Sequence, residues 1–597
     1  MGLLGLTVSP LLWSILLMFG GVFNVHVADL GETYVARNIG AWAAICLSLV
    51  LLWWWPMKQA TIAWSPLWLG GLFLPVIGAV FVLAVNIIGS FEHLHVGHYF
   101  MPLMLLAFAL FVLGLRQHDD ALPDLGLVTI AIFIAFLPQY LSYLVSENPF
   151  IGLFSPPFSF VMPSAFSKPS AGFGQYNLLG SQNATLMVMG ATAFVLLPMG
   201  TIRRFILGFV LVALTLDLPF IPSKTALLGI FIGLVFLAAH IFVQARQRET
   251  VIRFAMALAL VAVTYIGVIL VAYFGGVDSE LAQRTVATNQ SSFLFRYTMW
   301  VIGFWGFIEQ PIFGHGMGSY LSIYMEQFGR FGQDEELAFL ELAAVPHNLF
   351  IHIISEMGLF GLVVIMGPFI WFGLRLFHDA DNRWVLAALL FPILLHTQFE
   401  YPYIASGSHY WLFGVALVLA LFVGGVKHPL SHKAALPNKS TARFAFAGLT
   451  VFSAAGVFIS IMLMLDVHRS TLSFARATSL PLENYIEDRA NAPELSHPIL
   501  GKRLRAITNL HLMNMIMIEE RYDMLRPFAM PYFEKYVLTQ YPTPPVWELG
   551  LRAYFVLGEH KRLYALIDYM ALYKPQKAER FRTNFEAYLA LEASPPQ

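Results

Sequence analysis

The chain has 597 residues, of which 58% are hydrophobic and only 12% are charged, and its formal net charge is -1. A soluble protein is usually about 25% charged, so this composition excludes a soluble class and indicates a polytopic membrane protein. The near-zero charge argues against a nucleic-acid partner. A single cysteine, Cys46, excludes an intrachain disulfide.

Apolar stretches that are long enough to cross a hydrocarbon core as helices recur through the first 466 residues. The amino-terminal stretch lacks the basic region and cleavage site of a signal peptide, so we expect it to be a retained span. An all-α fold with about 12 to 13 transmembrane helices follows. The predicted spans lie near residues 10–27, 38–56, 66–90, 99–115, 125–146, 179–199, 202–219, 222–245, 251–275, 347–374, 383–398, 407–425 and 443–466.

Basic residues predict the orientation, because Lys and Arg in short loops stay on the cytoplasmic side. With a cytoplasmic amino terminus, loops such as MGTIRRF fall inside, and few cations remain in the outer loops. Residues 1–466 then form a membrane domain that contains a large outer loop at 276–346 with amphipathic helices. Residues 467–597 form a soluble helical domain on the outer side, in which helical hairpins resemble tetratricopeptide-type pairs.

The stretch VPHNLFIHIISEMGLFGLVV contains polar residues within a predicted helix that is otherwise apolar enough to span a membrane. His347 and Asn348 stand at its outer end, where unpaired backbone N–H groups can receive phosphate oxygens. Histidine can exchange protons near neutral pH, which makes His347 a candidate base. His352 and Glu356 are more simply interpreted as a buried hydrogen-bonded stripe, and the glycines as positions of close helix packing.

Three further pieces fall on the same outer side. AGFGQYNLLGSQNAT contains Gln175 and Asn177, whose amides suit sugar hydroxyls or phosphate. FIPSKTALLG carries Lys224. The loop stretch SSFLFRYTMWVIGFWGFIEQPIFGHGMGSY contains Arg296 on an aromatic, amphipathic segment that suits the lipid headgroup zone, and Arg284 is a second candidate cation.

FEHLHVGH at residues 91–98 supplies possible metal ligands, but its spacing does not secure a tetrahedral set, so no metal site is predicted. Neither a Gly-rich nucleotide loop nor a nucleophile elbow is present in the sequence, and no cofactor is expected.

PHNLFIHIISEMGLFG, preceded by PIFGHGMGSY, followed by HTQFEYPY and with GFGQYNLLG upstream, resembles one superfamily. The sequence is similar to bacterial O-antigen ligases and, more closely, to O-linked oligosaccharyltransferases of the PglL type. The resemblance implies an inner-membrane enzyme with its active site facing the periplasm. It also implies transfer of a preassembled glycan from undecaprenyl pyrophosphate to a Ser or Thr hydroxyl of an acceptor protein such as a pilin, by metal-independent inverting displacement.

The resemblance also assigns roles to residues. The histidine of the HN motif corresponds to His347, and Glu400 of the FEYP motif is an alternative base. Expected pyrophosphate or glycan ligands are Arg296, Lys224 (within a Ser-Lys-Thr variant of a Ser-Arg-Thr motif), Arg284, Gln175, Asn177, Asn348 and Tyr401.

Other functions stay open. An O-antigen ligase performs the same chemistry on a lipid A core sugar, and a glycan polymerase is a further enzymatic alternative. A lipid-linked-glycan transporter would instead place ionisable residues near the membrane midplane. The polar motifs collect at the outer ends of the spans, which favours an enzyme, and the region after residue 466 favours a protein acceptor.

Overall fold

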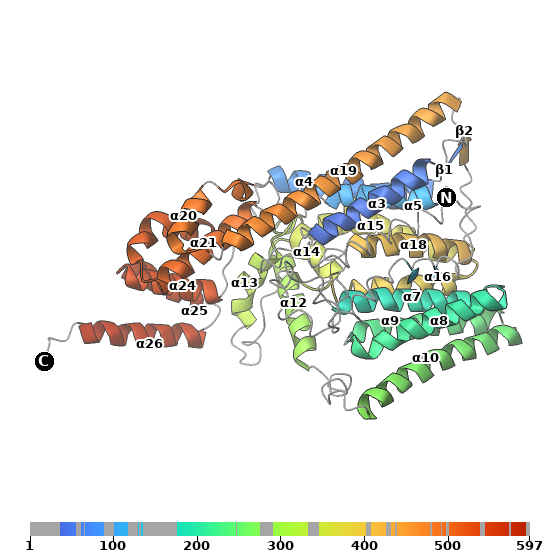
Figure 1. The fold of residues 1–597 in the computed structure, drawn as a ribbon, viewed down its shortest axis with the longest axis horizontal. Helices are drawn as coiled ribbons and strands as arrows, with labels where there is room; N and C mark the ends of the chain where they lie inside the picture. The colour runs from blue at the N-terminus through green and yellow to red at the C-terminus, as the bar shows by residue number, and fades with distance from the viewer. Residues whose placement is uncertain are drawn as a thin grey trace. The chain divides into compact units, whose positions relative to one another are not determined.

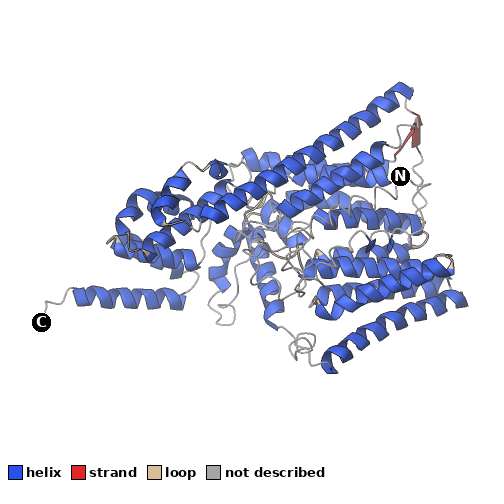
Figure 2. Cartoon of the chain, viewed as in Figure 1, coloured by secondary structure: helices blue, strands red, loops and turns tan. Residues whose placement is uncertain are grey.

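The computed structural model is helical apart from one pair of short strands (Figure 2). It describes residues 36–54, 61–64, 66–88, 101–116, 129–130, 133–134, 176–221, 223–245, 247–274, 290–331, 345–401, 407–425, 432–435, 439–477, 480–490, 492–496, 501–537, 544–571 and 575–592. The chain divides into two compact units, which interleave along the sequence and are described separately.

Unit 1 comprises residues 1–80, 100–288 and 363–468. Its helices follow the predicted spans closely (Figure 1). They are α3 (Ala36–Trp54), α4 (Pro66–Ile88, whose last turns belong to unit 2), α5 (Met101–Arg116), α7 (Tyr176–Leu196), α8 (Thr201–Asp217), α9 (Lys224–His240), α10 (Arg248–Phe274), α15 (Gly367–Asp379), α16 (Arg383–His396), α18 (Gly407–Val423) and α19 (Lys439–Ala477, which runs on into unit 2). Short 3-10 or π-helical segments extend three of them, η8 (Leu218–Phe220), η9 (Ile241–Ala245) and η10 (Leu362–Met366).

Helix α7 is the central helix of unit 1 and packs against α8, α9, α10 and α16 (Figure 1). Its apolar window is entirely buried, whereas only 11% of that of α10 is buried. Small residues allow the close approach, since a Cβ on Gly233 of α9 would lie 2.8 Å from Val188 of α7. The polar residues of α7 therefore face protein, while α10 presents Val263 and Ile266 outward as a lipid-facing helix does.

Two short strands were not predicted. β1 (Thr61–Trp64) pairs antiparallel with β2 (His432–Ala435), with Thr61 opposite Ala435. β1 lies between α3 and α4, and β2 lies between α18 and α19. Their pairing therefore links two interhelical connections of unit 1.

Unit 2 comprises residues 81–99, 289–362 and 469–597. Its first helices are α12 (Gln290–Glu309), α13 (Tyr320–Phe331) and α14 (Leu349–Gly361). The carboxy-terminal part holds α20 (Leu482–Ala490), η11 (Pro493–Ser496), α21 (Gly501–Ile518), η12 (Tyr522–Met524), η13 (Leu525–Ala529), α22 (Met530–Tyr532), η14 (Phe533–Val537), α24 (Pro544–Val556), α25 (His560–Ala571) and α26 (Pro575–Glu592).

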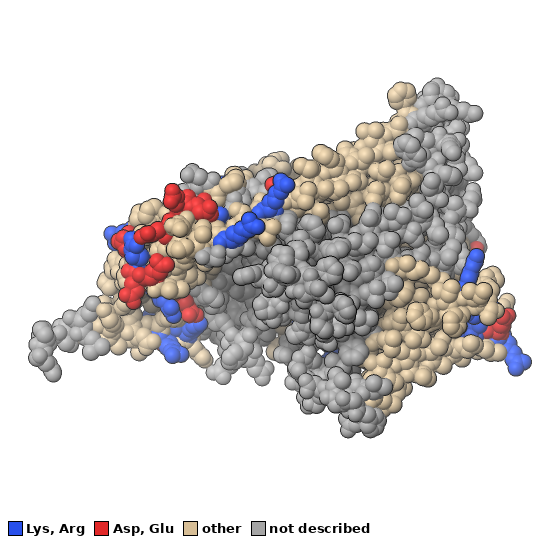
Figure 3. All heavy atoms as spheres, in the orientation of Figure 1, with Lys and Arg blue, Asp and Glu red and all other residues tan. Residues whose placement is uncertain are grey.

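The carboxy-terminal helices form a polar-surfaced bundle. Helix α25 packs against both α24 and α26 around a core that includes Trp547 and Phe533. On the face shown in Figure 3, acidic and basic side chains gather over these helices. The region is helical as predicted, but a tetratricopeptide-type arrangement stays a prediction, as does the domain boundary at residues 466/467.

Six described helical stretches are long and apolar enough to cross a membrane. They are Leu67–Ile88, Asn177–Leu196, Lys224–Ala245, Arg248–Leu270, Leu349–Asp379 and Phe444–Val467. The predicted first span lies outside the described residues, as does most of the fifth. Length and composition thus support several spans, while the membrane orientation stays a prediction.

Candidate active site

Asn348 fixes the start of helix α14. Its backbone is extended, and its side-chain Oδ1 accepts a hydrogen bond of 3.0 Å from the N–H of Ile351. This is an N-cap, which satisfies one of the unpaired donors of the first turn. The predicted start near residue 347 is therefore confirmed to within two residues, and the side chain of Asn348 has a structural role.

His347 precedes this cap in a left-handed conformation, with φ of 50°. Among the described residues only His347 and Glu520 adopt positive φ without being glycine. Such a conformation costs a side-chain-bearing residue about 1–3 kcal/mol, and these outliers concentrate at functional sites. The half-buried imidazole is thus held on a constrained backbone next to the positive end of the α14 dipole.

Helix α14 is interrupted by Gly358, which has φ of 63° and ψ of -164°. Instead of bonding within the helix, the N–H groups of Leu359 and Phe360 donate to the carbonyls of Pro311 and Ile312, at 2.8 and 2.9 Å. Backbone groups at membrane depth must be paired within the protein. The loop that precedes α13 therefore replaces the missing helical hydrogen bonds.

The same loop also pairs with the carbonyls on the other side of the break. The N–H groups of His315 and Gly316 donate to the carbonyls of Ser355 and Glu356, at 3.2 and 2.8 Å. Gly314 is needed here, because it has φ of 68° and a Cβ on it would lie 2.4 Å from the Glu356 carbonyl carbon. We name residues 311–320 the glycine loop.

Gly358 is closely packed, but its neighbour is not the helix that the sequence predicted. The sequence predicted that Gly358 and Gly361 would admit a neighbouring helix. A Cβ on Gly358 would instead meet the carbonyl oxygen of Ile312, in the glycine loop, at 2.4 Å. The physical reason is the broken backbone, which brings a loop, rather than a helix, against α14.

The carboxylate of Glu356 anchors the glycine loop. Glu356 is 1% exposed, and it accepts hydrogen bonds from the N–H groups of Gly318, at 2.7 Å, and Tyr320, at 3.0 Å. His352 Nε2 lies 3.1 Å from the same carboxylate. These contacts agree with the interpretation of His352 and Glu356 as internal support.

Arg296 lies in α12, the helix that packs on the first turn of α14. A Cβ on Gly303 would lie 2.4 Å from Ile351, so the two helices are in close contact there. Arg296 precedes Gly303 by seven residues, or two helical turns, and shares its face of α12. Its side chain is half-buried. Arg296 thus lies in a helix of unit 2 that packs on α14, and His347 immediately precedes the N-cap of α14.

A second group of predicted residues meets in unit 1. Asn177 Nδ2 donates a hydrogen bond of 2.5 Å to Glu400 Oε1, and both side chains are buried. Glu400 is held at the end of α16, where its N–H donates to the carbonyl of His396 at 3.0 Å. The amide and the carboxylate come from segments that the sequence analysis singled out independently.

Lys224 begins helix α9 beside this pair of segments. Ser223 caps α9 by accepting a hydrogen bond from the N–H of Ala226. A Cβ on Gly180 of α7 would lie 2.8 Å from Ser223, so the first turn of α7, which contains Asn177, packs on the start of α9. Lys224 is exposed at this helix N-terminus, where an anion is favoured.

Tyr401 is half-buried and packs against the apolar core of unit 1. Gln175 and Arg284 lie outside the described residues, as do the histidines of FEHLHVGH. The described residues contain no group of three or more His, Cys, Asp or Glu that could hold a metal ion. The candidate residues therefore form two sets, one in each unit.

Sequence reasoning missed two polar groups near these sets. Asn86, in α4, accepts a hydrogen bond of 3.1 Å from the N–H of Met317 through its Oδ1. His409, in α18, contacts the backbone of Leu178, next to Asn177. The alternating glycines of PIFGHGMGSY were a signal for an unusual loop, whereas an isolated Asn near the end of an apolar span gave none.

The comparison with family models covers part of the chain. Residues 209–366 match the O-antigen ligase family model. A comparison with curated proteins finds no match. The O-antigen ligase segment contains Lys224, Arg296, His347 and Asn348, while Asn177 and Glu400 lie outside it.

The O-antigen ligase match supports the O-antigen ligase superfamily that the sequence motifs indicated. It suggests a glycan-transferring membrane enzyme. Together with the apolar helices it indicates a multi-pass membrane protein.

Proposed function

We propose that this chain is a protein O-oligosaccharyltransferase of the inner membrane. It moves a preassembled glycan en bloc from undecaprenyl pyrophosphate to a Ser or Thr hydroxyl of a periplasmic protein such as a pilin. The observation that carries the proposal is the constrained His347 beside the capped start of α14, inside the segment that matches the O-antigen ligase family.

In this reaction the acceptor hydroxyl attacks the anomeric carbon of the glycan. The new C–O bond forms as the bond to the pyrophosphate oxygen breaks, and the bonding electron pair leaves with the pyrophosphate. Direct displacement inverts the anomeric centre. His347 takes the hydroxyl proton or orients the hydroxyl, and the fixed backbone on each side of it limits the directions its ring can adopt.

The departing pyrophosphate needs cationic stabilisation. Arg296 can supply a bidentate guanidinium, and Lys224 a point charge at the start of α9. Arg284 is a further candidate. The neutral amides of Gln175 and Asn348, together with Tyr401, suit glycan hydroxyls or phosphate oxygens.

Glu400 fits a positioning role better than that of the base. It is fully buried and accepts a hydrogen bond from Asn177. This hydrogen bond joins the first turn of α7 to the end of α16. The pair can hold the first turn of α7, and with it the start of α9, in one position.

The two leading candidate functions, a protein oligosaccharyltransferase and an O-antigen ligase, differ in the class of acceptor. The helical region from α20 to α26 offers a large polar surface for a protein acceptor, which supports the oligosaccharyltransferase. The description of the matched family supports an O-antigen ligase acting on lipid A core equally well. A lipid-linked-glycan transporter is the alternative of another class, and it would yield no covalent product.

The deciding experiment coexpresses the full chain with a lipid-linked glycan pathway and a candidate pilin, in cells that make a complete lipid A core. Intact masses of the pilin and of the lipid A core are then measured. We expect a glycan-sized increase on the pilin. An increase on the lipid A core alone identifies a ligase, and no increase on either rejects both enzymes.

His347→Ala and His347→Gln test the site in the same cells. Both should abolish transfer while leaving the amount of membrane-inserted protein unchanged. The matched control is His378→Gln, because His378 is an exposed histidine of α15 outside the matched segment. Near-normal product from His347→Ala would remove His347 from the mechanism.

Orientation is tested with reporter fusions to the full chain. Alkaline phosphatase, which is active only in the periplasm, should be active after residue 597 and inactive when inserted at residues 380–382, between α15 and α16. The reverse pattern would place the carboxy-terminal helices in the cytoplasm, away from pilins.

A further inference from the structure

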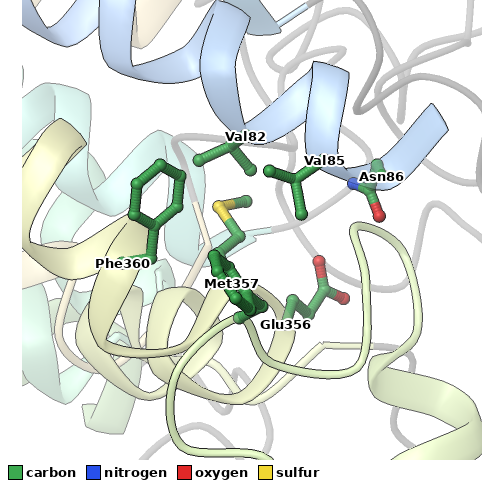
Figure 4. Close-up of a pocket in the computed structure, with 7 residues that line it drawn as sticks. Val82, Val85, Asn86, Glu356, Met357 and Phe360 are labelled. Atoms are coloured by element: carbon green, nitrogen blue, oxygen red, sulfur yellow. The ribbon is translucent and has the colours of Figure 1, made fainter. Parts of the chain in front are cut away.

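A small pocket lies where α4, α14 and the glycine loop meet within unit 2. It encloses about 220 Å³, counting its mouth, and is lined by Val82, Val85, Asn86, Phe313, Glu356, Met357 and Phe360. Figure 4 shows Asn86 and Glu356 at one end, and Val82 and Phe360 at the other. A water-sized sphere can occupy only about 10 Å³ of this space, which is room for about one water molecule, so it does not suit a sugar or a lipid headgroup.

The amide of Asn86 has a fixed orientation. Its Oδ1 accepts the hydrogen bond from the Met317 N–H. A flipped amide would place its NH₂ group against that N–H, donor against donor. Nδ2 is therefore the remaining polar atom of this pocket-lining side chain. It makes no hydrogen bond to the described residues, although Asn86 is only 4% exposed.

The chemistry of this end of the pocket excludes ions. Asn86 presents a donor, which disfavours a cation, and Glu356 presents a carboxylate, which disfavours an anion. A dry pocket would leave a buried N–H donor unsatisfied, at a cost of about 1–3 kcal/mol. What fits is a small neutral group that accepts one hydrogen bond and donates another.

We infer that the pocket is a binding site for one ordered water molecule that bridges Asn86 Nδ2 and the Glu356 carboxylate. A water occupies about 30 Å³ of liquid volume and is retained where it finds two to four polar partners. It joins α4 to the interrupted helix α14, beside the direct hydrogen bond from Met317 to Asn86. Asn86 thus contacts the glycine loop directly and, through the water, the carboxylate that anchors this loop.

The first test is an experimental map of the full chain, in lipid nanodiscs, at a resolution that shows other buried waters. We expect a density peak about 2.7–3.2 Å from both Asn86 Nδ2 and a Glu356 oxygen. Absence of a peak there, or an acyl chain in the pocket, would overturn the inference.

The second test fills the pocket. Val82→Ile adds one methylene to the lining, and we expect it to expel the water and lower the melting temperature by several degrees. The matched control is Val80→Ile, on an exposed side of the same helix, which should leave the melting temperature unchanged. A higher melting temperature for Val82→Ile would identify a dry cavity and contradict the inference.

Discussion

The amide of Asn177 donates a hydrogen bond of 2.5 Å to the carboxylate of Glu400, across 223 positions of the sequence. A hydrogen bond to a charged group contributes about 1.5–3 kcal/mol, and a partner left alone in a buried site costs more. The start of α7 and the end of α16 are therefore coupled through two side chains.

We expect Asn177→Leu and Glu400→Leu each to lower glycan transfer at least tenfold, and the double substitution to cost little more than either single one. The reason is that each single change already breaks the pair. Transfer rates in membranes that contain equal amounts of protein provide the measurement. Thr192→Val, at another buried polar position of α7, is the control. Fully additive losses would show that the two residues act separately.

Replacing Glu356 by Gln should destabilise the protein by about 1–3 kcal/mol, because it leaves one buried donor unsatisfied. The N–H groups of Gly318 and Tyr320 bond to different carboxylate oxygens, so the new NH₂ group would face one of these two donors and leave it without an acceptor. Thermal unfolding in detergent and the yield of monodisperse protein measure this effect. A stable Glu356→Gln variant that has lost turnover would instead make the carboxylate a participant in the reaction.

Gly358→Ala should be poorly folded, because it combines a left-handed backbone with a contact of 2.4 Å to the Ile312 carbonyl oxygen. The control is Gly373→Ala in α15, where a Cβ would meet nothing within 4 Å. This change should keep or slightly raise the melting temperature, since alanine is the better helix former. Equal behaviour of the two variants in a melting experiment would argue against the break in α14.

Replacing either proposed pyrophosphate ligand should lower the efficiency with which the lipid-linked glycan donor is used. Arg296→Ala and Lys224→Ala should each reduce kcat/KM for the lipid-linked glycan about 10–1000-fold. Lys224→Arg should retain activity, whereas Arg296→Lys should lose part of it, because lysine cannot form a bidentate contact. Arg375→Ala, at a half-exposed cation of α15, is the control. Unchanged donor kinetics in both alanine variants would remove the two residues from the site.

Alkaline pH should weaken the carboxy-terminal bundle through Tyr485. Burial raises the pKa of its phenol to about 12, and its hydroxyl donates to the Thr508 carbonyl. The unfolded chain releases this proton near pH 10, while the folded chain keeps it up to about pH 12. The stabilisation is complete below about pH 10 and is lost as the pH rises through about 12, to the extent of at most about 2–3 kcal/mol.

Tyr485→Phe should therefore flatten the fall in melting temperature between about pH 10 and pH 12. Melting of the full chain, followed by circular dichroism at several pH values, measures the slope. The matched control Tyr522→Phe replaces a half-buried tyrosine of the same region. Identical slopes for wild type and Tyr485→Phe would rule out this titration.

The sequence predicted the membrane helices well, because the length and the ends of an apolar run indicate the length and the ends of the helix. Helix α9 begins at Lys224, against a predicted start at residue 222, and α16 begins at Arg383, as predicted. The strands β1 and β2 were not predictable, since each has four residues and its partner lies far away in the chain.

The candidate site could be predicted in its residues but not in its contacts. Asn177 and Glu400 were each selected from their own motif, yet neither motif indicates that the other is its hydrogen-bond partner. The break at Gly358 was missed for a related reason. A glycine in an apolar helix is consistent both with close helix packing and with a break in the helix. Only the hydrogen bonds to the glycine loop show that Gly358 is a break.

The glycine loop and the broken part of α14 share four backbone hydrogen bonds. Backbone pairing depends on spacing more than on side-chain identity, so a single-residue insertion in either segment would shift all four at once. In chimeras between this chain and a distant homologue, residues 311–320 and 355–360 should therefore be exchanged as one cassette. Swapping one segment alone would leave backbone N–H and carbonyl groups of both segments without their partners.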